Sequence, residues 1–284
     1  ERGLWVLDIS KPKAPAVIEF VDTPGYARAL AVIGDRLFLA DGGRGIRIYG
    51  IQNRSDPEFL GSFEAMENAQ AIVGKGEYIY VANAQGGVII FNIADPAKIE
   101  PVGSFKTRGT ALDIAMWGDT VFVAEGAQGV EAVDVSNPSR PTGITIHTDF
   151  SLGNALSLEL SPAQGRLFVA DGENGLKVFN ITNPAEPRLI YELASNGRLQ
   201  DLSLMSNLAY LADAGGGIRV VLLMTEDMIF ELEGDSRAAH HIYWADLAPD
   251  KIAVSNLLVF GNQDGLGIYE IERKYKISPK GFAD

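Results

Sequence analysis

The chain has 284 residues, of which 46% are hydrophobic and 21% are charged, and it contains no cysteine. Its formal net charge of −13 argues against nucleic acid or an anionic membrane surface as a partner, because binding either one requires a positive surface. Without cysteine the chain can form no disulfide, thiolate metal site or covalent c-type haem attachment. No apolar run approaches the roughly 18–20 residues of a membrane span, so we expect no membrane insertion.

A glycine followed by a short apolar segment recurs along the chain at nearly constant spacing. Successive copies of this glycine are 42, 42, 42, 46, 42 and 48 residues apart. A period near 42 with strand-like content predicts an all-β chain folded as a β-propeller, with one four-stranded blade per repeat. The copies span Gly3–Leu7, Gly45–Tyr49, Gly87–Phe91, Gly129–Val133, Gly175–Phe179, Gly217–Val221 and Gly265–Tyr269.

The first 24 residues supply only the third and fourth strands of a blade, so we expect a half blade there. Six full blades are expected at about 26–66, 68–108, 110–150, 152–196, 197–235 and 240–280. The few residues after 280 cannot form the two missing strands. We therefore predict a single domain over 1–284, a seven-bladed ring whose first two strands lie upstream of Glu1. A six-bladed ring with an appended hairpin is the alternative.

The repeat at 110–150 shows the expected order of strands most clearly. Its second strand, Val121–Ala124, is apolar on both faces, which is typical of a strand covered by a neighbouring blade on each side. After the third strand comes the turn Asp134–Pro138, in which an Asp or Asn side chain can hydrogen-bond the backbone. The four expected strands are 110–117, 120–125, 130–135 and 142–148.

The repeat unit joins an alanine–acid pair, a glycine four residues after the acid, and an Asp/Asn–Pro turn. Residues Ala124–Pro141 read Ala-Glu-Gly-Ala-Gln-Gly-Val-Glu-Ala-Val-Asp-Val-Ser-Asn-Pro-Ser-Arg-Pro. This unit resembles the LVIVD-repeat propellers of bacteria and archaea, and the resemblance covers essentially the whole chain. Members of that family are often secreted or attached to the cell surface. The resemblance therefore implies an extracytoplasmic scaffold, without naming its ligand.

The loops at one end of the blades carry most of the polar variety. In an antiparallel blade, the connection before the first strand and the turn after the second strand emerge on one face, where a propeller usually binds its ligand. Arginines stand out there in an acidic chain, and their planar guanidinium groups favour an anionic ligand or an acidic partner segment. Surface salt bridges to acids such as Asp41 and Glu125 are the alternative role. The candidate ligand- or partner-binding residues are Arg28, Arg44, Gln70, Arg108, Asn154, His240 and His241.

A polar residue also ends each second strand. Recurrence in every full blade predicts that each of these side chains caps its own tight turn. The alternative is that their oxygens converge on the channel and hold Ca²⁺, for which Asp41, Glu125, Asp171 and Asp213 are the candidates. We assign no metal or other cofactor, with calcium as the alternative. The strand-end residues are Asp41, Asn83, Glu125, Asp171, Asp213 and Asn262.

Two further segments interrupt the regular pattern. His240 and His241 lie together near Asp246, but neighbours in a strand point to opposite faces, so we expect a surface or packing role rather than catalysis. The fifth full repeat replaces the proline turn with apolar residues. Met224, Met228 and Phe230 there are candidates for a partner interface if exposed, or for core packing if buried.

No nucleophile elbow, HExxH helix, P-loop or EF-hand loop is present in the sequence. We therefore predict a non-catalytic scaffold that binds another protein subunit or a ligand. A calcium-dependent hydrolase of lactonase type is one alternative, based on the acidic strand ends. An accessory subunit of an extracytoplasmic redox complex is the other, and any haem would then belong to a cytochrome partner.

Overall fold

The computed structural model shows an all-β chain with one short 3-10 helix, η1 (Pro162–Gln164), in the residues that it describes. Within that part, no helix is long and apolar enough to cross a membrane. The chain divides into two compact units, residues 1–8, 16–158 and 183–187 in the first and 9–15, 159–182 and 188–284 in the second. The structure describes residues 3–10, 16–64, 66–95, 98–144, 153–195, 197–205, 208–214, 217–225, 228–232, 241–244, 256–262 and 265–271.

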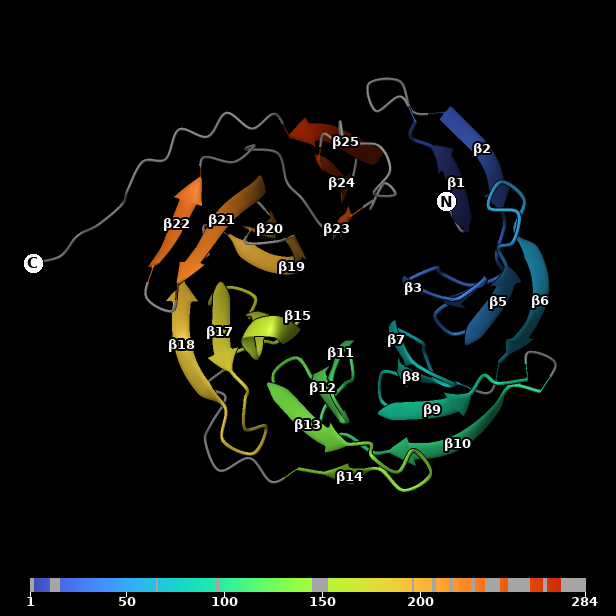
Figure 1. The fold of residues 1–284 in the computed structure, drawn as a ribbon, viewed down its shortest axis with the longest axis horizontal. Helices are drawn as coiled ribbons and strands as arrows, with labels where there is room; N and C mark the ends of the chain where they lie inside the picture. Colours follow the sequence, from blue (N-terminus) through green and yellow to red (C-terminus); the bar gives the residue numbers. More distant parts are fainter. Residues whose placement is uncertain are drawn as a thin grey trace, which may run out of the picture. The chain divides into compact units, whose positions relative to one another are not determined.

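The first unit contains a two-stranded sheet followed by four-stranded sheets, all antiparallel (Figure 1). In each sheet the strands lie in sequence order, so that short turns connect neighbours. The sheets are β1 (Leu4–Asp8) and β2 (Ala16–Val21); β3 (Ala29–Ile33), β4 (Arg36–Ala40), β5 (Ile46–Gly50) and β6 (Glu58–Phe63); β7 (Ala71–Lys75), β8 (Tyr78–Ala82), β9 (Val88–Asn92) and β10 (Glu100–Phe105); and β11 (Asp113–Trp117), β12 (Thr120–Ala124), β13 (Val130–Asp134) and β14 (Thr142–Gly143).

The remaining sheets follow the same order of strands and belong mostly to the second unit. The last of them has three strands in the part of the chain that is described. These sheets are β15 (Ser157–Ser161), β16 (Arg166–Ala170), β17 (Leu176–Asn180) and β18 (Arg188–Leu193); β19 (Arg198–Met205), β20 (Leu208–Ala214), β21 (Gly217–Thr225) and β22 (Met228–Leu232); and β23 (His241–Trp244), β24 (Asn256–Asn262) and β25 (Gly265–Ile271).

The second strand of each four-stranded sheet is buried on both faces, as its apolar sequence predicts. In β12 all five residues are buried, and Ala124, which ends the strand, is 0% exposed. Within the first unit, β3 contacts β7 and β7 contacts β11, so the first strands of successive repeats adjoin. Apolar clusters fill the space between successive sheets, for example Val81 with Ile48 and Val123 with Ile90. The core therefore lies between repeats.

The recurrent glycine is required by the backbone. Gly45, Gly87 and Gly175 have φ angles of 73°, 77° and 83°, in the left-handed region that glycine tolerates best. A Cβ atom at Gly87 would also lie 2.3 Å from the carbonyl oxygen of Phe105 at the end of the fourth strand. The period read from the sequence therefore marks the point where the third strand starts beside the end of the fourth.

The Asp/Asn–Pro turns use their side chains as the sequence predicts. Asp134 Oδ1 accepts a hydrogen bond from the Ser136 N–H at 2.8 Å, and Asn180 Oδ1 accepts one from the Thr182 N–H at 3.0 Å. The hydrogen bond from Ser136 also lowers the pKa of Asp134. β11 begins at Asp113, so the first strand of this repeat is shorter than the expected 110–117.

Candidate functional site

The polar side chain at the end of the second strand accepts hydrogen bonds from the connection that precedes the first strand of the same repeat. Asp41 is fully buried, and its Oδ1 accepts a hydrogen bond from the Thr23 hydroxyl at 2.7 Å. Its Oδ2 accepts a second hydrogen bond from the Gly25 N–H at 3.0 Å. Both donors lie in the connection between β2 and β3. The carboxylate is therefore a structural link between two loops on one face of the repeat.

The same link recurs with different chemistry in other repeats. The Asn68 N–H donates to Asn83 Oδ1 at 2.9 Å, and the Ser195 hydroxyl donates to Asp213 Oδ2 at 2.8 Å. The prediction that each side chain caps its own turn is therefore wrong for Asp41 and Asn83. The donor lies 15 or 18 residues before the acceptor, because the two loops adjoin at the same end of the sheet.

One strand-end residue accepts a hydrogen bond within its own turn. Asp171 accepts a hydrogen bond from the Asn174 amide within its own turn, at 3.1 Å, as predicted. The side chain of Asn262, in β24, lies outside the described residues. Among the described residues, no group of three or more His, Asp or Glu side chains converges as metal ligands would.

Backbone hydrogen bonds also join each of these turns to the next repeat. In the first unit the Ala69 N–H donates to the Gly42 carbonyl at 2.9 Å, and the Ala111 N–H donates to the Ala84 carbonyl at 2.9 Å. In the second unit the Leu199 N–H donates to the Gly172 carbonyl at 2.9 Å. The loops on this face are thus fixed both within a repeat and between repeats.

The structure places the predicted binding residues of the first unit in these fixed loops. Arg28, just before β3, and Arg44, in the turn after β4, are exposed, as is Arg108 before β11. Gln70 and Asn154 occupy the corresponding connections before β7 and β15 and are partly buried. The arginines are therefore presented by backbone that is already held in place.

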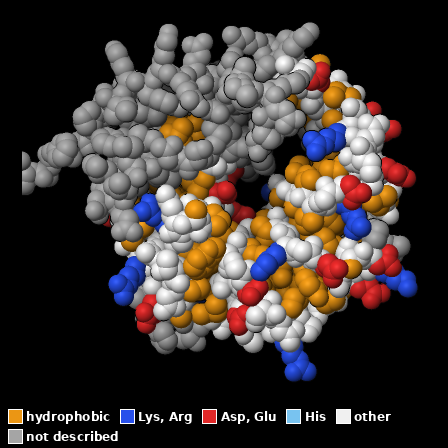
Figure 2. Space-filling model, in the orientation of Figure 1, with side chains coloured by type: hydrophobic (Ala, Val, Ile, Leu, Met, Phe, Trp, Pro, Cys, Tyr) orange, Lys and Arg blue, Asp and Glu red, His pale blue; other side chains and the backbone are white. Residues whose placement is uncertain are grey.

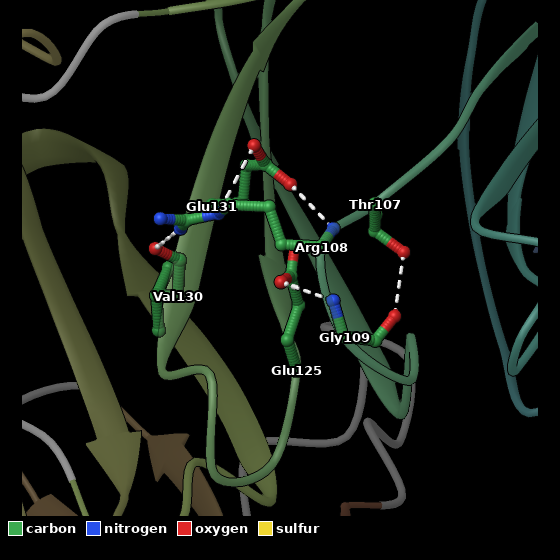
Figure 3. A network of polar contacts seen from close by, with 6 residues as sticks. All are labelled: Thr107, Arg108, Gly109, Glu125, Val130 and Glu131. Atoms are coloured by element: carbon green, nitrogen blue, oxygen red, sulfur yellow. Dashed lines mark hydrogen bonds and ion pairs between the residues drawn. The ribbon is translucent and has the colours of Figure 1, made fainter.

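Arg108 differs from Arg28 and Arg44 because its side chain has partners of its own (Figure 3). Its Nε lies 3.4 Å from Glu131 Oε1, and its backbone N–H donates to Glu131 Oε2 at 3.3 Å. Its Nη2 donates to the Val130 carbonyl at 3.4 Å. The side chain remains more than half exposed, at 59%.

Beneath Arg108 lies a pair of carboxyl groups, Glu125 and Glu131, of which the sequence singled out only Glu125. Glu125 Oε2 accepts a hydrogen bond from the Gly109 N–H at 2.9 Å, as Asp41 does from the Gly25 N–H. The pKa of Glu125 is raised to about 8, first by burial and then by the Glu131 carboxyl, against the lowering effects of the Gly109 N–H and Arg108. Figure 3 shows the Glu125 carboxyl directed toward the side chains of Arg108 and Glu131.

A comparison between repeats reveals what sets this pair apart. Six residues after the strand-end acid, three other repeats carry a cation, namely Arg47, Lys177 and Arg219. Arg47 contacts Tyr49 and Phe59, whereas the other two lie beside the acid of their own repeat. Lys177 Nζ lies 3.8 Å from Asp171 Oδ2, and Arg219 Nη1 lies 3.6 Å from Asp213 Oδ2. Glu131 occupies that position relative to Glu125. The signal was present in the sequence, but it becomes visible only once this position is known to face the strand-end acid.

The remaining predicted site residues fall in segments whose side chains the structure does not describe. His240 lies outside the described residues, and His241 begins β23, where its backbone pairs with Gly261. Met224 lies in β21 at a register shift, and Met228 and Phe230 lie in β22. Their candidate roles stay predictions.

Repeated four-stranded sheets, packed first strand to first strand and linked by turns on one face, define the chain as a protein of the β-propeller class. A model of the LVIVD repeat matches residues 1–23, 24–65, 67–107, 108–148 and 165–194. The chain belongs to the LVIVD-repeat family. No curated protein matches the sequence.

Solved structures support the fold class at low sequence identity. A Lactobacillus plantarum protein has a TM-score of 0.75 and 14% identity, covering 94% of this chain and 88% of its own. Chaetomium thermophilum Sqt1, bound to the N-terminus of the ribosomal protein L10, has a TM-score of 0.66 and 16% identity, covering 94% and 77%. A chain of the Mitotic Checkpoint Complex has a TM-score of 0.69 and 12% identity, covering 95% and 82%.

Proposed function

We propose that this chain is a non-catalytic scaffold that binds a protein partner through the loop face that carries Arg28, Arg44 and Arg108. The observation that carries the proposal is the fixing of these loops by buried hydrogen bonds, such as those of Asp41, beneath exposed arginines. Binding by preorganised groups avoids the entropic cost of ordering them. That Sqt1 was solved with the N-terminus of a ribosomal protein adds support, since its fold is similar.

The charges of the loop face favour an acidic segment as the bound part of the partner. In the part of the chain that the structure describes, neither Arg28 nor Arg44 forms an ion pair. Asp41, the nearest strand-end acid in sequence, has both of its oxygens occupied by Thr23 and Gly25. The guanidinium groups are therefore available for carboxylates of a partner. Figure 2 shows basic and acidic side chains interspersed on the part of the surface that is coloured by side-chain type.

The test uses a fluorescein-labelled peptide of ten glutamates as the probe, with fluorescence anisotropy as the measurement. We expect the wild type to bind it and Arg28→Ala/Arg44→Ala to weaken binding about tenfold at low salt, with the difference shrinking as salt is raised. Arg54→Ala/Arg140→Ala is the matched control, because it removes the same charge from turns after the third strands. Equal weakening by both double variants, or no binding by the wild type, would refute the proposed site.

We also propose that the chain forms a seven-bladed ring. The support is the two-stranded sheet β1–β2, the four-stranded sheets after it and the sheet β23–β25. A crystal structure showing six radial sheets would contradict it. We also place the protein outside the cytoplasm, as the family resemblance implies, and fractionation of cells that make a tagged form tests this location.

A further inference from the structure

The carboxyl pair beneath Arg108 lacks one positive charge. In the repeats with Lys177 and Arg219, one acid faces one cation. Here two carboxyls, Glu125 and Glu131, face a single guanidinium, that of Arg108. If both acids were ionised, one negative charge would remain uncompensated in a buried place, which is costly.

An oxygen atom of Glu125 that has no hydrogen-bond partner in the described part of the chain indicates where a compensating proton would be held. Glu125 is 2% exposed, and its Oε1 has no hydrogen-bond partner among the described residues. The other oxygen, Oε2, already accepts the Gly109 N–H. Two carboxyl groups can form a hydrogen bond with one another only if one of them carries a proton. A proton on Glu125 would satisfy Oε1 and balance the charge of the cluster in one step.

The described groups that surround Glu125 and Glu131 provide little further positive charge to compensate the two carboxyls. Glu131 faces Glu125 from β13, and Arg108 faces it from the connection before β11. Asp113, which begins β11, directs its carboxylate to the N–H groups of Ile114 and Leu158 at 2.8 and 2.7 Å. The Thr107 hydroxyl donates to the Gly109 carbonyl at 2.8 Å and so is not directed at the pair.

We propose that Glu125 and Glu131 share one proton, and that its release draws Arg108 toward the pair and away from an acidic partner. The proton passes to solvent and leaves a second carboxylate beside the guanidinium. The contact between Arg108 Nε and Glu131 Oε1, now 3.4 Å long, can shorten when that attraction increases. The regulatory part of this inference rests on the proposed function, because it assumes that Arg108 contributes to binding.

The raised pKa of Glu125, about 8, places the transition between pH 7 and 9. The glutamates of the decaglutamate probe stay ionised throughout this range, because their ordinary pKa is about 4.3. We expect the wild type to lose about fivefold in affinity for the probe from pH 7 to 9. Glu125→Gln, which keeps this position neutral, should bind with the same affinity at both pH values.

Two variants complete the comparison. Glu67→Gln is the matched control, because it removes an exposed acid from the corresponding connection of the neighbouring repeat, and it should keep the wild-type transition. Arg108→Ala should bind weakly at both pH values. An identical pH dependence in the wild type and Glu125→Gln would overturn the regulatory proposal.

Titration of the Glu125 side-chain carboxyl by ¹³C NMR tests the shared proton without any partner. A midpoint near pH 8 that falls in Glu131→Gln supports the proposal, and a midpoint below pH 6 overturns it. If the probe fails to bind at any pH, the proposed function fails while this titration still decides whether the proton is shared. A calcium-induced rise of the melting temperature at pH 8.5 that Glu125→Gln abolishes would assign the site to a metal and overturn the proton.

Discussion

Arg219 Nη1 lies 3.6 Å from Asp213 Oδ2, and both side chains are buried, at 7% and 0% exposure. Arg219 also donates to the Ala194 carbonyl at 2.7 Å, so it connects the strand-end acid to the preceding connection. A different repeat of the chain solves the same problem without charge, since Asn83 is followed six residues later by Ile89. The strand-end site therefore holds an acid with a cation in one of these two repeats and a neutral pair in the other.

We expect Arg219→Met to destabilise the protein by about 3 kcal/mol, because it leaves the Asp213 carboxylate buried without its cation. Urea denaturation at pH 7 measures the effect. Adding Asp213→Asn should recover much of the loss, since the double variant reproduces the neutral pair of Asn83 and Ile89. A double variant less stable than Arg219→Met would contradict this explanation.

The link made by Asp41 predicts a graded pair of substitutions. Asp41→Ala removes the acceptors of both Thr23 and Gly25 in a buried place, so we expect a loss of about 2–3 kcal/mol. Thr23→Val removes only one hydrogen bond and should cost about 1 kcal/mol. Thermal unfolding measures both. If the two variants were equally stable, the second hydrogen bond of Asp41, from the Gly25 N–H, would not contribute to stability.

The repeat glycine can be tested against another glycine of the same sheet. Gly76 has a φ of 59° and open space around its Cα, so Gly76→Ala should cost about 1 kcal/mol from the backbone alone. Gly87→Ala adds a Cβ only 2.3 Å from a carbonyl oxygen and should cost clearly more. Equal losses of stability in urea denaturation would mean that glycine is needed at position 87 only for its positive φ angle, and not for the close approach of the carbonyl oxygen.

Much of the fold could be predicted from the sequence because its strongest signals are local. The recurrent glycine, such as Gly87, indicates a backbone position with positive φ. The unbroken apolar sequence of the second strands, which includes Val123, indicates burial on both faces. The strand-end acids were also visible. Their donors were not, because Thr23 and Asp41 meet only through the return of the chain at the end of the sheet.

The carboxyl pair shows the limit of that approach. Glu131 follows Glu125 by six residues, across a turn, and nothing local distinguishes it from a solvated strand residue. Its importance depends on the cation that Lys177 or Arg219 supplies at the same position in other repeats. Aligning the repeats by their glycine would have revealed the substitution, but its consequence follows only from the burial of Glu125.

One position of the turn after the second strand carries a residue that its backbone disfavours. Ala84 has a φ of 44°, where Gly42 and Gly126 in the neighbouring repeats have 58° and 59°. Ala84→Gly relieves this strain, and we expect it to stabilise the protein by up to about 1 kcal/mol, less the extra entropy that glycine gives the unfolded chain. A melting temperature lowered by Ala84→Gly would show that the methyl group contributes more through packing.

The pH dependence of stability follows from the raised pKa of Glu125. Between its ordinary value of 4.5 and its folded value of about 8, the folded protein holds a proton that the unfolded chain has lost. The free energy of unfolding must then fall as pH rises through this window, by at most about 1.4 kcal/mol per pH unit from this group, and level off above pH 8. Glu125→Gln removes that slope, so the variant should gain stability over the wild type as pH is raised from 5.5 to 8. Urea denaturation at pH 5.5, 6.5, 7.5 and 8.5 measures the difference, with Glu67→Gln as the control that should follow the wild type. Parallel curves for the wild type and Glu125→Gln would show that Glu125 titrates at its ordinary pKa.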